Sequence, residues 1–234
     1  MKNQYLCDIN DYVKYGLLRA LADGGKFPIT VAWMLTQDDG GNDGKKRCYL
    51  KDAKKHRGHD GELFDCLAKL TTHEAAHVGH VRESGIIPGA RYFADLVIDE
   101  REHRAAWLDN LWRFANGSRL VFFDPDNGFE VKSVKAGRKN SHKYLYWNEF
   151  AEAWKRGYSV LVYQHFPRVG RDEYLKGIAD QVLYVAPTAE VISVSSSTVG
   201  YILAMQPRDA VRLKTAIEGV AISWEGKVLV RRDH

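Results

Sequence analysis

The sequence predicts an α/β fold: a Rossmann-like, largely parallel sheet flanked by helices, with an antiparallel strand pair at its C-terminal end. Short runs of β-branched and aromatic residues alternate with segments of helical periodicity through the middle of the chain, as in β-α-β units of a parallel sheet. The strands expected at residues 190–194 and 200–205 are separated only by a short serine-rich turn. That spacing favours an antiparallel pair, because a parallel connection needs a crossover of a dozen or more residues.

Each helix is predicted from its apolar spacing and its end signals. The first has Asp8 or Asn10 as its N-cap and ends at Gly24-Gly25. The helix before the central strand carries tryptophan and leucine side chains at helical spacing and closes at Asn116-Gly117. Helices are expected at residues 8–22, 62–70, 99–115, 146–156, 172–181 and 207–218.

The strands are predicted as short apolar runs bounded by glycine, proline and acidic turn residues. They are expected at residues 29–35, 120–123, 159–163, 190–194, 200–205 and 228–230. The stretch 92–98 is also apolar, and its periodicity fits either a strand or the end of a helix.

Length and composition predict one domain over residues 1–234, because 234 residues with 45% hydrophobic content can build one sizeable core. No apolar run reaches the roughly 18 residues of a membrane span. The first eight residues contain no apolar segment of signal-peptide length. We therefore expect a cytoplasmic protein with no membrane partner. Three widely spaced cysteines, Cys7, Cys48 and Cys66, argue against a disulfide framework.

The central strand, residues 120–123, stops at a corner of turn residues that carries candidate catalytic groups. Asp124, Asp126 and Asn127 follow the strand directly, Pro125 ends strand pairing, and Gly128 permits a sharp turn. Ligands of open α/β sheets bind outside such strand ends. We therefore expect these three side chains to be catalytic; the competing interpretation is an ordinary acidic turn.

Two other predicted strands also end in polar residues. The first leads into Asp38-Asp39-Gly40-Gly41, and the strand after the central one leads into Gln164-His165. If the strands are parallel, all three ends meet at one edge of the sheet. His165 is therefore added to the candidate catalytic residues.

Basic residues gather in two loops, at about residues 44–60 and 130–143, in a chain of formal net charge +4. Such loops beside a carboxylate-lined strand end suit the phosphate backbone of DNA or RNA, although solvated loops have the same composition. The candidate nucleic-acid contacts are Lys45, Lys46, Arg47, Lys54, Arg57, Arg138, Lys139 and Lys143.

His73, Glu74 and His77 match the H-E-x-x-H zinc pattern. The motif is short and chance matches are common. We favour an exposed helix face with histidines, and no metal site is predicted from this segment.

The order of these motifs resembles that of the class I S-adenosylmethionine-dependent methyltransferases, and loosely the ribosomal-RNA adenine-N6 type. Each family motif has a counterpart in the same order, namely Asp11-Tyr12-Val13-Lys14-Tyr15, Ile87-Pro88-Gly89-Ala90, Val97-Ile98-Asp99, Asp124-Pro125-Asp126-Asn127 and Thr198-Val199-Gly200 leading to Met205-Gln206-Pro207. The resemblance implies methyl transfer to a base, with S-adenosylmethionine as cofactor. The residues implied to hold the cofactor are Asp38, Asp39, Gly40, Gly41 and Asp99.

The corner departs from the family pattern, so other activities stay open. The family has Pro-Tyr or Pro-Phe where this chain has Asp126-Asn127, and Phe129 is displaced. A DNA glycosylase could use Asp124 and Asn127 on a flipped base and would need no cofactor. A nuclease could use Asp124, Asp126, Glu130 and Lys132 and would need Mg²⁺. A nucleic-acid binder without catalysis is the remaining interpretation.

Overall fold

The protein, seen in a computed structural model, is described for residues 1–38, 40, 44, 46–72 and 76–232. In this part of the chain one sheet holds seven strands in the order β2-β1-β3-β6-β8-β7-β9. The strands are β1 (Ile29–Ala32), β2 (Arg91–Phe93), β3 (Leu120–Phe123), β6 (Ser159–His165), β7 (Glu190–Ser195), β8 (Val199–Met205) and β9 (Leu229–Arg232).

The first four strands of the sheet, β2, β1, β3 and β6, run parallel. Strand β8 is antiparallel to both β6 and β7, and β9 is antiparallel to β7. The predicted fold class, a largely parallel sheet with antiparallel strands at the C-terminus, is therefore confirmed. A small second sheet pairs β4 (Gly128–Phe129) with β5 (Tyr144–Leu145).

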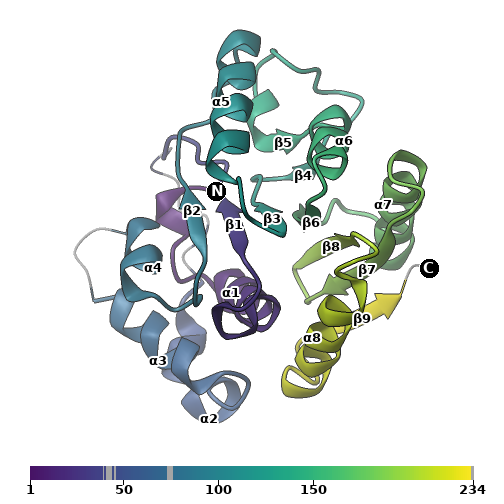
Figure 1. The fold of residues 1–234 in the computed structure, drawn as a ribbon. Coiled ribbons are helices and arrows are strands. Elements are labelled where there is room, and N and C mark those ends of the chain that lie inside the picture. The colour runs from purple at the N-terminus through teal and green to yellow at the C-terminus, as the bar shows by residue number, and fades with distance from the viewer. Residues whose placement is uncertain (39, 41–43, 45, 73–75, 233–234) are drawn as a thin grey trace.

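Helices cover both faces of the large sheet (Figure 1). One face packs against α1 (Ile9–Ala22), α3 (Gly61–Leu70) and α8 (Ala210–Ser223). The other packs against α5 (Arg101–Phe114), α6 (Trp147–Lys155) and α7 (Arg171–Val185). Two short helices, α2 (Ala53–His56) and α4 (Gly79–Ser84), lie in the long connection between β1 and β2. Single 3-10 turns occur at Asn3–Tyr5, Asp23–Gly25, Cys48–Lys51 and Ser141–Lys143.

Strand β3 shows why the apolar runs are continuous rather than alternating. Leu120 and Phe122 belong to the core on the α1 face, and Val121 and Phe123 belong to the core on the α5 face. A strand buried on both faces needs apolar side chains at every position. The first predicted strand is shorter than expected because Met34 has a φ of 45°, a left-handed conformation that ends regular pairing after Ala32.

The stretch 92–98, which was ambiguous in the sequence, contains the end of strand β2, and Leu96 forms an isolated parallel bridge to Leu35.

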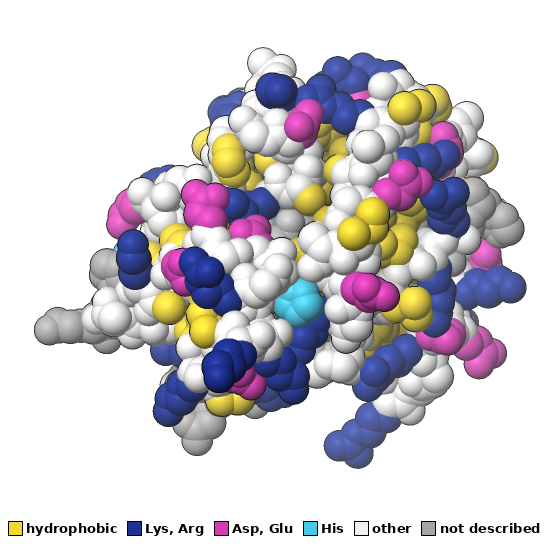
Figure 2. Space-filling model, turned by 90° about the horizontal axis from the view of Figure 1, so that it is seen from below, with side chains coloured by type: hydrophobic (Ala, Val, Ile, Leu, Met, Phe, Trp, Pro, Cys, Tyr) yellow, Lys and Arg dark blue, Asp and Glu magenta, His cyan; other side chains and the backbone are white. Residues whose placement is uncertain are grey.

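Lys and Arg side chains lie among Asp and Glu side chains on the face seen in Figure 2, without one continuous basic patch. Within the described ranges, every helix is too short or too polar to span a lipid bilayer.

Candidate functional site

The candidate site lies where the order of the strands reverses. From β1 the chain first adds β2 on one side, and later adds β3 on the other side of β1. In open α/β sheets, ligands bind in the crevice outside the carboxyl ends of the two strands at such a switch point. Here those ends are the residues after Ala32 and after Phe123, which are paired in register.

A buried network of one cation and two carboxylates lies at this crevice. Lys14, on α1, places Nζ 2.7 Å from Oδ1 of Asp11 and 2.8 Å from Oδ2 of Asp124. All three side chains are 3% exposed. Asp11 and Lys14 share one helix face because they are three residues apart. Asp124 reaches them because its N–H still bonds to the Ala32 carbonyl, at 3.1 Å, before Pro125 ends the ladder.

Burial sets the titration of this network. Desolvation raises the pKa of Asp11 to about 6, although the neighbouring Lys14 ammonium acts in the opposite direction. Burial also disfavours the charged form of Lys14, but Asp11 and Asp124 outweigh it, and the pKa of Lys14 lies above its ordinary value. Lys14 is therefore a permanent cation that holds the carboxylate after β3 in place.

A second ammonium group joins the ends of β1 and β3. The Met1 amino group lies 2.7 Å from Oδ1 of Asp126 and donates to the carbonyl oxygens of Met34 at 3.2 Å and Asp124 at 3.0 Å. The Thr36 hydroxyl donates to Oδ2 of Asp126 at 3.3 Å. Burial acts to raise the pKa of Asp126, but the Met1 ammonium and Lys2 outweigh it and hold that pKa below its ordinary value. These oxygens therefore form a cradle for a primary ammonium, which we call the ammonium cradle.

The corner after β3 also meets the end of β6, as the sequence predicted. The His165 N–H donates to the Asn127 carbonyl at 3.1 Å, and Nε2 of Gln164 donates to the same carbonyl at 3.0 Å. Oε1 of Gln164 accepts from the Phe129 N–H at 2.9 Å. Gly128 has a φ of 110°, which lets the chain turn between these contacts. Asp124, Asp126, Asn127 and His165 thus lie at one edge of the sheet.

The residues implied to hold a cofactor are only partly brought together. Oδ1 of Asp38 accepts from the Gln4 N–H at 3.3 Å, and Gly40 has a φ of 68°. Asp39 and Gly41 lie outside the described residues.

Asp99 anchors the loop at residues 130–143. Its carboxylate accepts hydrogen bonds from the backbone of Asn140 and His142, from the Ser141 hydroxyl and from Nδ1 of His142, at 2.6–3.0 Å. Burial acts to raise the pKa of Asp99, but the hydrogen bonds from His142 and Asn140 outweigh it and keep that pKa below its ordinary value.

The predicted nucleic-acid contacts fall into different environments. Arg47 donates twice to the Leu6 carbonyl, and Arg57 pairs with Asp65. Lys46 is exposed and lines a cavity beside His165. Four other predicted contacts, Lys54 on α2 and Arg138, Lys139 and Lys143 in the loop that Asp99 anchors, belong to segments that do not line that cavity, and Lys45 lies outside the described residues.

Only part of the H-E-x-x-H motif at residues 73–77 lies within the described residues. His73 and Glu74 lie outside the described residues, and Nδ1 of His77 accepts from the Gly79 N–H at 3.0 Å. Across the described part of the chain, no three side chains of the metal-ligating kinds cluster together. Glu130, a candidate nuclease residue, accepts from the Trp147 N–H at the start of α6.

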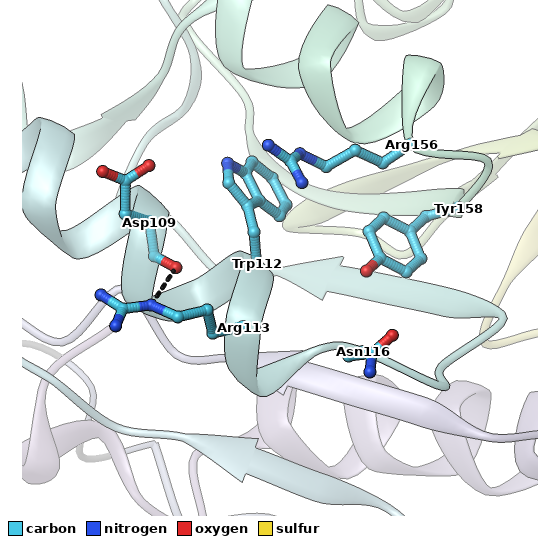
Figure 3. A pocket seen from close by; sticks show the side chains of 6 residues that line it. All are labelled: Asp109, Trp112, Arg113, Asn116, Arg156 and Tyr158. Carbon is cyan, nitrogen blue, oxygen red and sulfur yellow. Dashed lines mark hydrogen bonds between the residues drawn. The ribbon is translucent and has the colours of Figure 1, made fainter.

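A second cavity, of about 700 Å³, lies at the amino ends of β3 and β6 and holds none of the predicted site residues. Figure 3 shows that Asp109, Trp112 and Arg113 come from α5, and that Arg156 and Tyr158, from the segment between α6 and β6, lie beside the Trp112 ring. Its position is opposite to the edge where α/β sheets bind ligands.

Lys14 is the site residue that reasoning from the sequence missed. Asp11 and Lys14 entered only as letters of a family motif. Their signal was two charged residues three apart on a helix whose other positions on that side are apolar. Buried charges are rare unless paired, so an acidic and a basic residue on the buried side of a helix are a signal of a buried ion pair, although they do not show that Asp124 joins it.

Comparisons with known proteins do not assign a family to this chain. No family model and no curated protein matches the sequence. One solved structure that resembles it is a protein of Legionella pneumophila str. Philadelphia 1 assigned to the family model DUF519, with a TM-score of 0.47 and 10% identity over 97% of each chain.

Proposed function

We propose that this protein transfers a methyl group from S-adenosylmethionine to a base of DNA or RNA at the crevice between the carboxyl ends of β1 and β3. The observation that carries the proposal is the ammonium cradle. Two strand-end carbonyls, of Met34 and Asp124, and the Asp126 carboxylate surround a primary ammonium at 2.7–3.2 Å. The methionyl part of S-adenosylmethionine carries the same group.

The oxygen atoms of the crevice fit the amino group of that cofactor. The cradle supplies anionic and carbonyl oxygens for an α-amino group, and in this structure the Met1 ammonium fills it. Met1 must therefore leave before another ammonium can enter. When bound, the cofactor supplies an electrophilic methyl group on a positively charged sulfur.

We propose different roles for the residues of the corner after β3. Asp124 is buried and paired with Lys14, so we assign it the role of holding the corner after β3 in position. Asn127 is partly exposed, and its carbonyl already bonds to the end of β6. Its side-chain amide can both donate to and accept from the edge of a base. Asp126 and Asn127 are therefore the groups proposed to meet cofactor and base.

The test is incubation with S-adenosylmethionine labelled in its methyl group, using DNA and RNA substrates, followed by mass spectrometry of nucleosides and released bases. We expect a labelled methylated base. Calorimetry with Asp126→Asn should show weaker cofactor binding, because hydrogen bonds to charged groups are worth roughly 1.5–3 kcal/mol. The loss should be smaller than the roughly 10- to 100-fold that this energy corresponds to, because the same substitution also weakens the hold on the competing Met1 ammonium. The matched control is Asp109→Asn on α5, which should bind the cofactor as the wild type does.

The same incubation separates the alternatives. A glycosylase would release a free base without added cofactor, and a nuclease would shorten the strand only with Mg²⁺ present. Absence of both cofactor binding and methylated nucleosides in the wild-type protein would refute the proposal.

A further inference from the structure

A cavity of about 670 Å³ lies beside the candidate site and is built from four separate segments. Its lining, which we call the basic groove, consists of Asn10, Lys46, His165, Phe166, Pro167, Arg168, Val169, Gly170, Arg171, Ser197 and Thr198. These residues come from the start of α1, the connection after β1, the segment from β6 into α7, and the turn between β7 and β8. The groove therefore opens at the same edge of the sheet as the corner after β3.

The lining is basic, and its charges have no ion-pair partner among the described residues. Lys46, Arg168 and Arg171 are exposed, and none of the described residues that line the cavity is acidic. Within the described ranges, no carboxylate lies within ion-pair distance of these three side chains. Many other arginines of the chain are paired, including Arg57 with Asp65 and Arg104 with Glu149. The groove is thus a place where positive charge is left open to an anionic ligand.

The backbone at the groove adds to this preference. Helix α7 begins there with Gly170 as its N-cap, and no side chain caps its first N–H groups. The N-terminus of a helix carries a positive partial charge and open N–H donors. Apart from the chain directly adjoining Gly170, no described atom lies within 4 Å of the place where a side chain on Gly170 would begin, so a ligand can come close to the backbone.

Packing holds the groove's walls in position. The Phe166 ring lies against Gly200, where an added Cβ would be 3.2 Å from the ring, and the Arg171 guanidinium lies 5.5 Å from the ring centre. Elsewhere in the lining, the Thr198 hydroxyl donates to Oδ1 of Asn10 at 2.5 Å. Arg171 and the β7–β8 turn are therefore held by contacts to the sheet and to α1.

We infer that the basic groove binds the sugar-phosphate backbone of a single-stranded nucleic acid that carries the target base; this inference rests on the proposed function. His165 lines the groove and bonds through its N–H to Asn127, so a strand in the groove passes next to the corner. A cavity of this size is in the range that holds small ligands and short chain segments, and it is too small for a duplex. Enzymes that act on bases take a single strand or an extruded nucleotide.

The experiment measures the fluorescence anisotropy of a labelled 12-nucleotide DNA or RNA strand at 50–200 mM NaCl, without cofactor. The test variant is Arg168→Ala with Arg171→Ala. Its matched control, Arg113→Ala with Arg156→Ala, removes the same charge from the cavity at the opposite end of the sheet. We expect the test variant to weaken binding by about 10- to 60-fold at 50 mM NaCl and to lower the salt slope by about 1.4, because each lost phosphate contact contributes roughly 0.7 to that slope. The control should change affinity by less than about 3-fold.

Several outcomes would overturn the inference. Equal losses of affinity in the two double variants would mean that strand binding depends on the net charge of the protein and not on the basic groove. A mononucleotide that competes as well as the strand, at equal phosphate concentration, would mean that the groove holds isolated phosphates. Tighter binding of an acidic peptide than of the strand would assign a different polyanion.

The two proposals can fail separately. Because the binding experiment contains no cofactor, groove binding without methyl transfer would remove the proposed function and leave this inference standing. If methyl transfer occurs and is unchanged in Arg168→Ala with Arg171→Ala, the proposed function stands and the inference about the basic groove fails.

Discussion

Lys14→Met is the substitution that most directly tests the buried network at the strand end. Lys14 contacts two carboxylates, at 2.7 and 2.8 Å, and all three side chains are 3% exposed. Removing one partner of a buried ion pair costs about 3–5 kcal/mol, because the charge that remains is desolvated and unpaired. For a chain of 234 residues this corresponds to a fall of roughly 6–20 °C in Tm, at about 2–4 °C per kcal/mol.

The loss should depend on pH. The pKa of Asp11 is already raised to about 6 by burial, and Lys14 is the group that opposes this rise. In Lys14→Met the pKa of Asp11 should therefore rise further. A carboxyl whose folded-state pKa is raised costs stability above that pKa, and the cost disappears as the pH falls towards the unfolded value near 4. The deficit of the variant should thus be largest at pH 7 and markedly smaller at pH 5.

Urea unfolding at both pH values measures this, with Lys176→Met as the control at an exposed position of α7. The control should change stability by less than about 0.5 kcal/mol. Adding Asp124→Asn to Lys14→Met should recover part of the loss at pH 7. A deficit below about 1 kcal/mol at pH 7, or one that is equal at pH 5 and 7, would refute the reasoning.

Two further predictions concern the backbone around the site. Gly128→Ala should destabilise the protein by about 2–4 kcal/mol, because Gly128 has a φ of 110° and a Cβ there would lie 2.2–2.3 Å from the side-chain amide of Gln164. The control is Gly219→Ala in α8, where the residue has open space and no positive φ. This variant should be neutral or stabilising in the same unfolding assay. Equal stability of the two variants would contradict the predicted clash and backbone strain at Gly128. Asp99→Asn should release the loop at residues 130–143, since its carboxylate accepts four hydrogen bonds from residues 140–142. Trypsin should then cut after Lys132, Lys135 or Arg138 several-fold faster than in the wild type, while Asp109→Asn should leave the cutting rate unchanged.

The positions of the strand ends were readable because they depend on local chemistry. Apolar runs such as Leu120–Phe123 and Ser159–Tyr163 stop at proline, glycine, amide or acidic residues, and the structure ends or interrupts the strands near these points. Once the strands are parallel, the ends after β1, β3 and β6 must share one edge. The meeting of Asp126 with Thr36, and of Asn127 with His165, follows from that topology.

The partners of individual charges were not readable. Lys14 and Asp124 are 110 residues apart, and no local pattern connects them. Arg47 and Arg57, both from the first basic run, are bound to neighbouring groups. Arg168 and Arg171, which had not been selected, line the basic groove, and no described carboxylate forms an ion pair with them. Likewise the sequence did not show that the carboxylate of Asp99, for which a cofactor role remains a prediction, accepts hydrogen bonds from the loop at residues 140–142.

By itself, then, the sequence determined the fold class and the edge of the sheet at which polar groups gather, because hydrophobic periodicity and turn chemistry act over a few residues. Only the tertiary structure decided which carboxylates are neutralised, which cations stay open to a ligand, and that the ends of β1 and β3 form an ammonium cradle. Those outcomes depend on distances between atoms that are far apart along the chain, and electrostatic energy in a buried site changes steeply with such distances.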